Sequence, residues 1–222
     1  SAELELRIGG RDRVVRLQQC RLYVLVDAGP SDEAFVSMVE ALAAGAVDIF
    51  KIRDRSVDDR KLIARARIGH AIARRQDTLF IMNDRADLAV AADVDGVHVG
   101  QDELPVAAAR EIVGGRMIGV STHSMEQALQ AVKDGADYIG CGPVFPSSTK
   151  TFDHYVGTDW LADVTREVDL PAFAIGGIGL GNVDQVIAAG MRRIAVTGAI
   201  RESNEPRRVA EQLHTKLGLA TQ

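Results

Sequence analysis

Short apolar runs alternate with amphipathic segments along most of the chain. The apolar runs predict strands at residues 21–27, 48–53, 78–82, 96–99, 117–121, 138–142, 172–176 and 193–198. Most of these runs are apolar at nearly every position, which is typical of parallel strands that are covered on their outer face. The segments between them carry apolar residues at helical spacing and predict helices at 32–44, 58–75, 86–92, 105–113, 124–134, 159–167, 181–189 and 205–216.

Start and stop signals support these boundaries. Ser31 and Ser124 stand where a side chain can cap a helix, and Pro105 stands near a helix start. A glycine also stands between helix and strand at Gly45, Gly135 and Gly190, where it can end a helix in the left-handed conformation. The repeated unit predicts an α/β fold, a single (β/α)8 TIM barrel over residues 21–217. Residues 1–20 form a short N-terminal extension, with a helix as one interpretation.

Composition agrees with one domain of barrel size. The chain has 222 residues, of which 46% are hydrophobic and 5% aromatic, so small aliphatic side chains form the core. A net charge of −5 without a basic block disfavours a nucleic-acid partner, and no apolar run reaches the length of a membrane span. Cys20 and Cys141 lack metal-ligand spacing and are expected to be reduced, in a cytoplasmic protein.

The last two predicted strands both end in small residues. The sequence IGGI occupies 175–178 and AVTG occupies 195–198. Glycine leaves backbone N–H groups uncovered, so a phosphate can approach them closely. Turns after the last two strands are a common phosphate site in TIM barrels, although a Gly-Gly pair can also be only a tight turn.

Three cations follow the second predicted strand with a period of two. Lys51, Arg53 and Arg55 therefore share one face if the chain stays extended. Such a cluster favours an anionic ligand. The alternative is a solvated strand end at which Asp54 is the local partner.

Carboxylates follow the third and fourth predicted strands. Asp84 and either Asp102 or Glu103 would lie beside the cations, where two carboxylates suit one Mg2+ completed by water and phosphate oxygens. Alternatively, Asp84 caps a helix and Glu103 is a surface carboxylate.

The fifth and sixth predicted strands lead to hydroxyl groups, a histidine and a lysine. Ser121 can hydrogen-bond a substrate, and His123 is either an acid or base or a residue at a helix entry. Ser147 and Thr149 precede Lys150, a pattern that suits phosphate binding.

The order of these motifs resembles the thiamine-phosphate synthase family over residues 21–216. The motifs that carry the resemblance are KIRDR at 51–55, NDRADLA at 83–89, GVHVGQ at 96–101, GVSTHS at 119–124, GADY at 135–138, GPVFP at 142–146, TK at 149–150 and IGGI at 175–178. The resemblance implies a (β/α)8 barrel that joins hydroxymethylpyrimidine diphosphate to thiazole phosphate with Mg2+. It also implies a dissociative substitution, in which diphosphate leaves before the thiazole nitrogen captures the pyrimidine-methyl cation.

The resemblance also implies roles for individual residues. Arg53, Ser121 and Lys150 would be catalytic, and Asp84 and Glu103 would hold the metal. The implied substrate-binding residues are Lys51, Arg53, Arg55, Asn83, Ser121, Ser147, Thr149, Lys150, Gly177, Thr197 and Gly198. The partners would be these small-molecule substrates, with no nucleic acid or membrane, and homo-oligomer formation stays open.

This chain departs from the family pattern at several of these positions. The family usually has glutamine at Lys51, where it reads the pyrimidine, lysine at Arg55, aspartate at Glu103, and valine-serine at Thr197 and Gly198. A protonated lysine only donates hydrogen bonds, whereas glutamine also accepts them. Two alternatives therefore stand beside the synthase. One is a thiazole tautomerase of the same fold, and the other is a catalytically impaired phosphate-binding relative.

Overall fold

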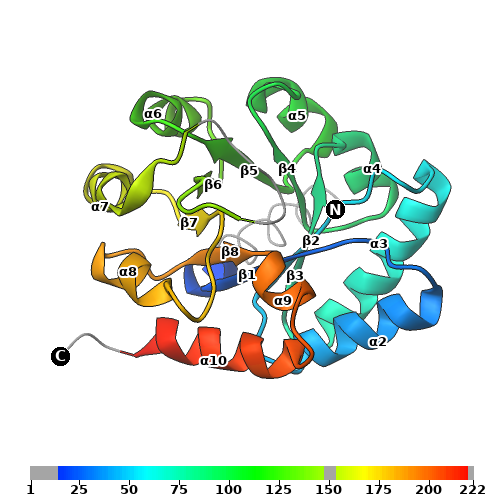
Figure 1. Cartoon of the computed structure of the whole chain (residues 1–222). Helices are drawn as coiled ribbons and strands as arrows, with labels where there is room; N and C mark the ends of the chain where they lie inside the picture. The colour runs from blue at the N-terminus through cyan, green and yellow to red at the C-terminus, as the bar shows by residue number, and fades with distance from the viewer. Residues whose placement is uncertain (1–14, 148–153, 220–222) are drawn as a thin grey trace.

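The computed structural model describes residues 15–147 and 154–219, and its strands form a closed parallel barrel in chain order, as predicted (Figure 1). The strands are β1 Leu22–Val26, β2 Ile49–Ile52, β3 Leu79–Asn83, β4 Gly96–Val99, β5 Met117–Thr122, β6 Tyr138–Cys141, β7 Ala172–Ile175 and β8 Ile194–Val196. Every neighbouring pair is parallel, and β8 closes the barrel by pairing with β1.

Helices surround the strands on the outside of the barrel (Figure 1). They are α2 Asp32–Ala43, α3 Asp59–Arg74, α4 Ala86–Ala91, α5 Val106–Val113, α6 Met125–Lys133, α7 Gly157–Glu167, α8 Val183–Ala188, α9 Gly198–Arg201 and α10 Pro206–Gly218. The sequence pattern missed α9, because four residues are too few to show a helical period. Within the described ranges, no helix combines the length and apolar character needed to cross a membrane.

Local signals explain several of the helix starts. The Ser31 and Ser124 hydroxyls accept from the N–H groups three residues on, as predicted, and Pro105 is the N-cap of α5. The left-handed residue after α2 is Ala46 with φ +65°, so the expectation for Gly45 is wrong. The chain thus turns one residue later than the glycine, and Ala46 takes the left-handed conformation that glycine would adopt more easily.

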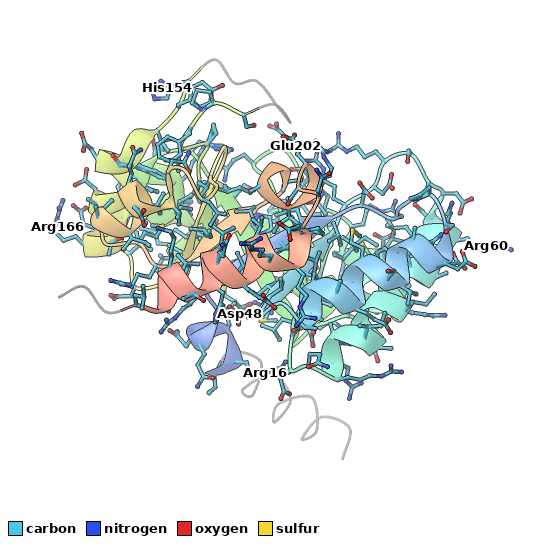
Figure 2. All side chains as sticks on the ribbon, turned by 60° about the horizontal axis from the view of Figure 1, so that its bottom comes forward. Arg16, Asp48, Arg60, His154, Arg166 and Glu202 are labelled. Atoms are coloured by element: carbon cyan, nitrogen blue, oxygen red, sulfur yellow. The ribbon has the colours of Figure 1, made fainter. Side chains whose placement is uncertain are left out.

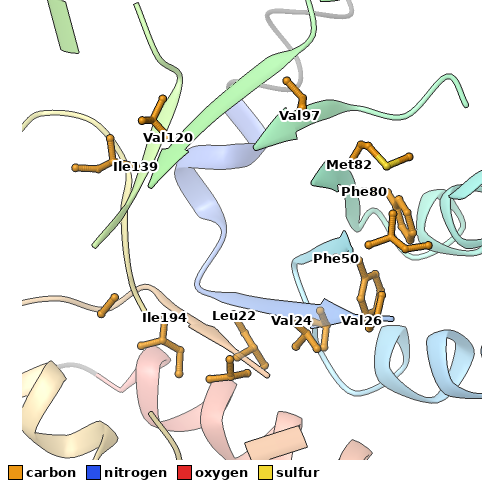
Figure 3. Close-up of a cluster of buried hydrophobic side chains, with 14 of the residues drawn as sticks. Leu22, Val24, Val26, Phe50, Phe80, Met82, Val97, Val120, Ile139 and Ile194 are labelled. Carbon is orange, nitrogen blue, oxygen red and sulfur yellow. The ribbon is translucent and has the colours of Figure 1, made fainter. Parts of the chain in front are cut away.

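The strands separate two apolar clusters. Side chains on the outer face pack beneath the helices, among them Leu22, Phe50, Phe80, Val97 and Ile139 (Figure 3). Side chains on the inner face form a second cluster that fills the barrel, including Tyr23, Ile49, Leu79, Met117, Tyr138 and Phe173. The strands are therefore mostly apolar on both faces, which explains why nearly every position in their sequences is apolar.

Residues 15–19 are helical and lie at the end of the barrel where the strands begin. Leu17 is 1% exposed and, with Cys20, joins the cluster inside the barrel. Figure 2 shows Arg16 at this end and His154 and Glu202 at the opposite end. The end beside Arg16 is thus closed by apolar packing, which leaves the carboxyl ends of the strands for a ligand.

Candidate active site

One cavity of about 980 Å³ opens where the strands end. It gathers every sequence-predicted site residue that the structure describes, namely Lys51, Arg53, Arg55, Asn83, Asp84, Glu103, Ser121, Ser147, Gly177, Thr197 and Gly198. Thr149 and Lys150 lie outside the described residues. Side chains that are far apart in sequence meet here because parallel strands all end at the same face of the barrel.

The β2 end places one buried and two exposed cations at the cavity. Lys51 is 6% exposed, whereas Arg53 and Arg55 are exposed to solvent. Asp54 is not their partner, because its carboxylate accepts from the backbone N–H groups of Ala28 (3.0 Å) and Ser56 (2.8 Å). Asp54 therefore holds the loop after β2 and does not neutralise Arg53 or Arg55.

Burial lowers the pKa of Lys51 from 10.5 to about 8, because the charged ammonium loses its hydration. The negative charges of Asp84 and Glu103 oppose this change, and the positive charge of Arg53 adds to it. Both carboxylates thus lie close enough to Lys51 to act on its charge. The ammonium also lies 6.0 Å from the ring centre of Tyr23.

Asp84 has a strained backbone at the end of β3. Its φ is +61°, and the N–H of Arg85 donates to the carbonyl of Asn83 across it. Arg85, not Asp84, is the N-cap of α4, so the helix-cap alternative is wrong. The Asp84 carboxylate instead lies 3.5 Å from the guanidinium of Arg55.

The carboxylates offer oxygen ligands for a magnesium ion. The Glu103 carboxylate lies over Gly100, in the space that a Cβ there would need, and Asp102 also lines the cavity. The described residues contain no cluster of three or more acidic, histidine or cysteine side chains that could hold a metal alone. Two carboxylates completed by water and phosphate oxygens are a common Mg2+ arrangement, and Asp84 and Glu103 supply oxygen donors of this kind.

The opposite wall of the cavity is built from backbone. Gly177 has φ +63°, and a side chain there would overlap the carbonyls of Phe145 and Pro146. Asn182 ties this turn together by donating to the Gly177 carbonyl (2.8 Å) and accepting from the N–H of Gly179 (2.8 Å). Glycine is therefore required at 177 for close packing against the next loop.

The missed helix α9 adds to this wall. Its first backbone bonds are donated by Ile200 and Arg201, both to the carbonyl of Thr197. The N–H groups of Gly198 and Ala199 belong to the first turn, which has no intrahelical acceptor. Since the cavity is lined by residues 197–199 and by Gly177, both predicted turns face the same space.

His98 is the main cavity residue whose role the sequence did not reveal. It is 5% exposed, and its Nε2 lies 2.9 Å from the Ser121 hydroxyl. Burial, and then the charge of Lys51, lower its pKa well below 6.5, so the ring is neutral. His123 also lines the cavity, and its Nδ1 lies 2.5 Å from the carbonyl of Gly142.

The strands form a closed parallel barrel. At their carboxyl ends, cations and carboxylates line one side of the cavity and glycine turns line the other. This is the architecture of the phosphate-handling (β/α)8 barrels. The chain belongs to the thiamine monophosphate synthase family, whose family model matches residues 22–200. The family resemblance and the fold predicted from the sequence are thus confirmed.

Relatives in three organisms are similar over most of the chain. A thiamine-phosphate synthase of Rhodopirellula baltica is 52% identical over 205 residues, which cover 89% of this chain and 55% of that protein. One of Chloroflexus aurantiacus is 40% identical over 202 residues, covering 90% of this chain and 94% of that protein. The solved thiamine phosphate pyrophosphorylase of Pyrococcus furiosus has a TM-score of 0.81 and 31% identity, covering 90% of this chain and 96% of that one. The chain therefore spans about half the length of the first relative and nearly all of the other two.

Proposed function

We propose that this chain joins hydroxymethylpyrimidine diphosphate to thiazole phosphate, giving thiamine phosphate and diphosphate. The observation that carries the proposal is the single cavity in which Arg53, Arg55, Asp84 and Glu103 face the glycine turn at Gly177. One cavity with two kinds of anion-binding wall suits two phosphorylated substrates held side by side. Membership of the thiamine monophosphate synthase family supports the same reaction.

The charges of the cavity suit a diphosphate leaving group. The C–O bond between the pyrimidine methylene and the diphosphate breaks, and its electron pair leaves on the diphosphate oxygen. The lone pair of the thiazole nitrogen then forms the new C–N bond to that carbon. Arg53 and Arg55 would hold the departing charge, and the Asn83 amide would donate to it, because prearranged donors stabilise charge as it develops.

Asp84 and Glu103 would repel a diphosphate unless a cation lies between them. We infer that these two side chains hold Mg2+ when substrate is present. The ion supplies charge neutralisation to the leaving group. The salt bridge between Arg55 and Asp84 would then open toward the ligand, because each group gains a stronger partner.

Ser121 and Lys51 would face the pyrimidine ring from the floor of the cavity. Ser147, Gly177, Thr197 and Gly198 would surround the phosphate of the thiazole. Thr149 and Lys150 keep the roles that the resemblance implies, as part of the same proposal.

The direct test is diphosphate release, measured with both substrates together and with each alone. Release is expected only with both present and with Mg2+. Arg53→Ala should raise the KM for the pyrimidine diphosphate and lower kcat. The matched control is Arg60→Ala, since Arg60 projects outward from helix α3 at the edge of the molecule (Figure 2) and does not line the cavity.

Two other outcomes would assign the chain differently. Isomerisation of a thiazole phosphate without diphosphate release would favour the tautomerase alternative. Binding of both phosphorylated ligands without turnover of either would favour a catalytically impaired relative.

A further inference from the structure

A row of three residues crosses the barrel wall beneath the candidate active site. His98 on β4 is in register with Gly119 on β5, and Gly119 is in register with Tyr138 on β6. A Cβ on Gly119 would overlap the Tyr138 ring and lie 2.5 Å from His98 Nδ1. The glycine therefore creates the space in which the tyrosine and histidine side chains meet.

These side chains form a continuous line of hydrogen bonds. The hydroxyls of Tyr23 and Tyr138 lie 3.0 Å apart, the Tyr138 hydroxyl lies 3.1 Å from His98 Nδ1, and His98 Nε2 lies 2.9 Å from the Ser121 hydroxyl. Tyr23, Tyr138 and His98 are all buried. The line thus begins inside the barrel and ends at Ser121, on the cavity floor.

A neutral imidazole has one donor and one acceptor nitrogen, so the line can run in only two directions. If it runs inward, Ser121 donates to Nε2, Nδ1–H donates to Tyr138, and Tyr138 donates to Tyr23. The Tyr23 hydrogen then has no acceptor among the described residues, because the Tyr138 hydroxyl is the one hydrogen-bond partner that they offer the Tyr23 hydroxyl.

If the line runs outward, every hydrogen of the three buried side chains has an acceptor. Tyr23 donates to Tyr138, Tyr138 donates to Nδ1, and Nε2–H donates to the Ser121 oxygen. Buried donors without an acceptor are rarer and costlier than oxygens with a spare lone pair. The outward direction leaves the Ser121 hydrogen free for a ligand.

We propose that Tyr138 is a positioning residue that acts through His98 to keep the Ser121 hydroxyl a donor toward the substrate. Ser121 would then select a heteroaromatic ring that presents an unprotonated ring nitrogen, rather than an amino group, to the cavity floor. This specificity rests on the proposed function in one respect, which is that the pyrimidine is the ring that Ser121 faces.

The first test measures the His98 tautomer by 15N NMR of the ligand-free, histidine-labelled chain, with the signals assigned by His98→Gln. Protonated Nε2 and unprotonated Nδ1 are expected. Tyr138→Phe should move the Nδ1 resonance to that of a nitrogen without a hydrogen bond, whereas Tyr23→Phe should leave it in place. Both variants keep the ring that packs with Phe173, 5.8 Å from Tyr138 and 5.5 Å from Tyr23.

A protonated Nδ1 in the unmodified chain would overturn the proposal. It would mean that the Tyr23 hydrogen finds an acceptor, such as a water molecule in the small cavity of about 20 Å³ beside it. Because this spectrum is recorded without substrate, it decides the direction of the line even if the chain does not catalyse the proposed reaction.

The second test compares the pyrimidine diphosphate with an analogue in which the accepting ring nitrogen is a C–H group. The unmodified chain should prefer the nitrogen form by on the order of tenfold in kcat/KM, the size expected for one buried hydrogen bond. Ser121→Ala should lose this preference, and Tyr138→Phe should weaken it. Equal preference in the unmodified chain and in Ser121→Ala would contradict the assignment of Ser121 as the donor.

Discussion

Lys51 should make the stability of this protein depend on pH in the alkaline range. Its side chain lies on β2 between Leu25 and Ile81 of the neighbouring strands and is 6% exposed. Burial lowers its pKa from 10.5 to about 8, despite the opposing charge of Asp84. Replacement by methionine keeps the length of the side chain and removes the charge.

The direction of this pH dependence follows from whether the folded or the unfolded chain keeps the lysine proton. Below pH 8 the lysine is protonated in the folded and the unfolded chain, so the folded chain bears the full cost of a buried charge. Between pH 8 and 10.5 only the unfolded chain keeps the proton, so the free energy of unfolding rises with pH. The pKa difference corresponds to about 3 kcal/mol, at roughly 1.4 kcal/mol for each unit.

Urea unfolding of the unmodified chain and of Lys51→Met between pH 7 and 10.5 measures this effect. The unmodified chain should gain about 3 kcal/mol relative to the variant across this range. Lys133→Met, at the last residue of α6, is the control for the loss of one positive charge from a helix outside the cavity. Parallel pH profiles for the unmodified chain and Lys51→Met would refute the burial of a charged ammonium at this position.

Three further predictions concern the proposed reaction. Asp84→Asn should lower magnesium-dependent turnover on the order of a hundredfold in steady-state assays and leave the circular dichroism spectrum unchanged, because the ion loses a carboxylate. Asp59→Asn, at an exposed ion pair on α3, should keep full activity, and equal losses in both variants would exclude the metal role. Gly177→Ala should weaken thiazole phosphate binding and lower Tm in calorimetry, since its Cβ overlaps neighbouring carbonyls. Gly114→Ala, also at a positive φ but with open space around it and outside the cavity, should leave phosphate binding unchanged. Lys51→Gln should lower the KM for the pyrimidine diphosphate by the equivalent of roughly 1–3 kcal/mol, because the amide can also accept a hydrogen bond. A higher KM with lower turnover would instead show that Lys51 itself contacts the substrate.

The barrel could be predicted from the sequence because burial on both sides of a strand makes nearly every position apolar. Phe50 faces the helices while Ile49 faces the barrel interior, so neither position tolerates a polar side chain. Helix α9 was not predicted, because a single helical turn is too short to show a hydrophobic period. Its position was still marked by the small residues Thr197 and Gly198, which lie at its start.

The candidate site was predictable where residues follow a strand directly, as Arg53 and Asp84 do. The role of His98 was not predictable, because one histidine within GVHV carries no information about its partners. Its partner Tyr138 comes forty residues later, and the two meet only through the strand register across Gly119. Asp54 was likewise ambiguous, since its two backbone donors come from different loops.

The most direct test of the central claim measures the ratio of thiamine phosphate formed to diphosphate released. The two substrates are mixed with this chain and Mg2+, and both products are quantified in the same sample. Equal amounts of the two products, with neither formed when one substrate is omitted, are predicted by a cavity that holds both substrates at once. Diphosphate released without thiamine phosphate, or no release at all from a folded chain that binds both substrates, would contradict the proposed reaction.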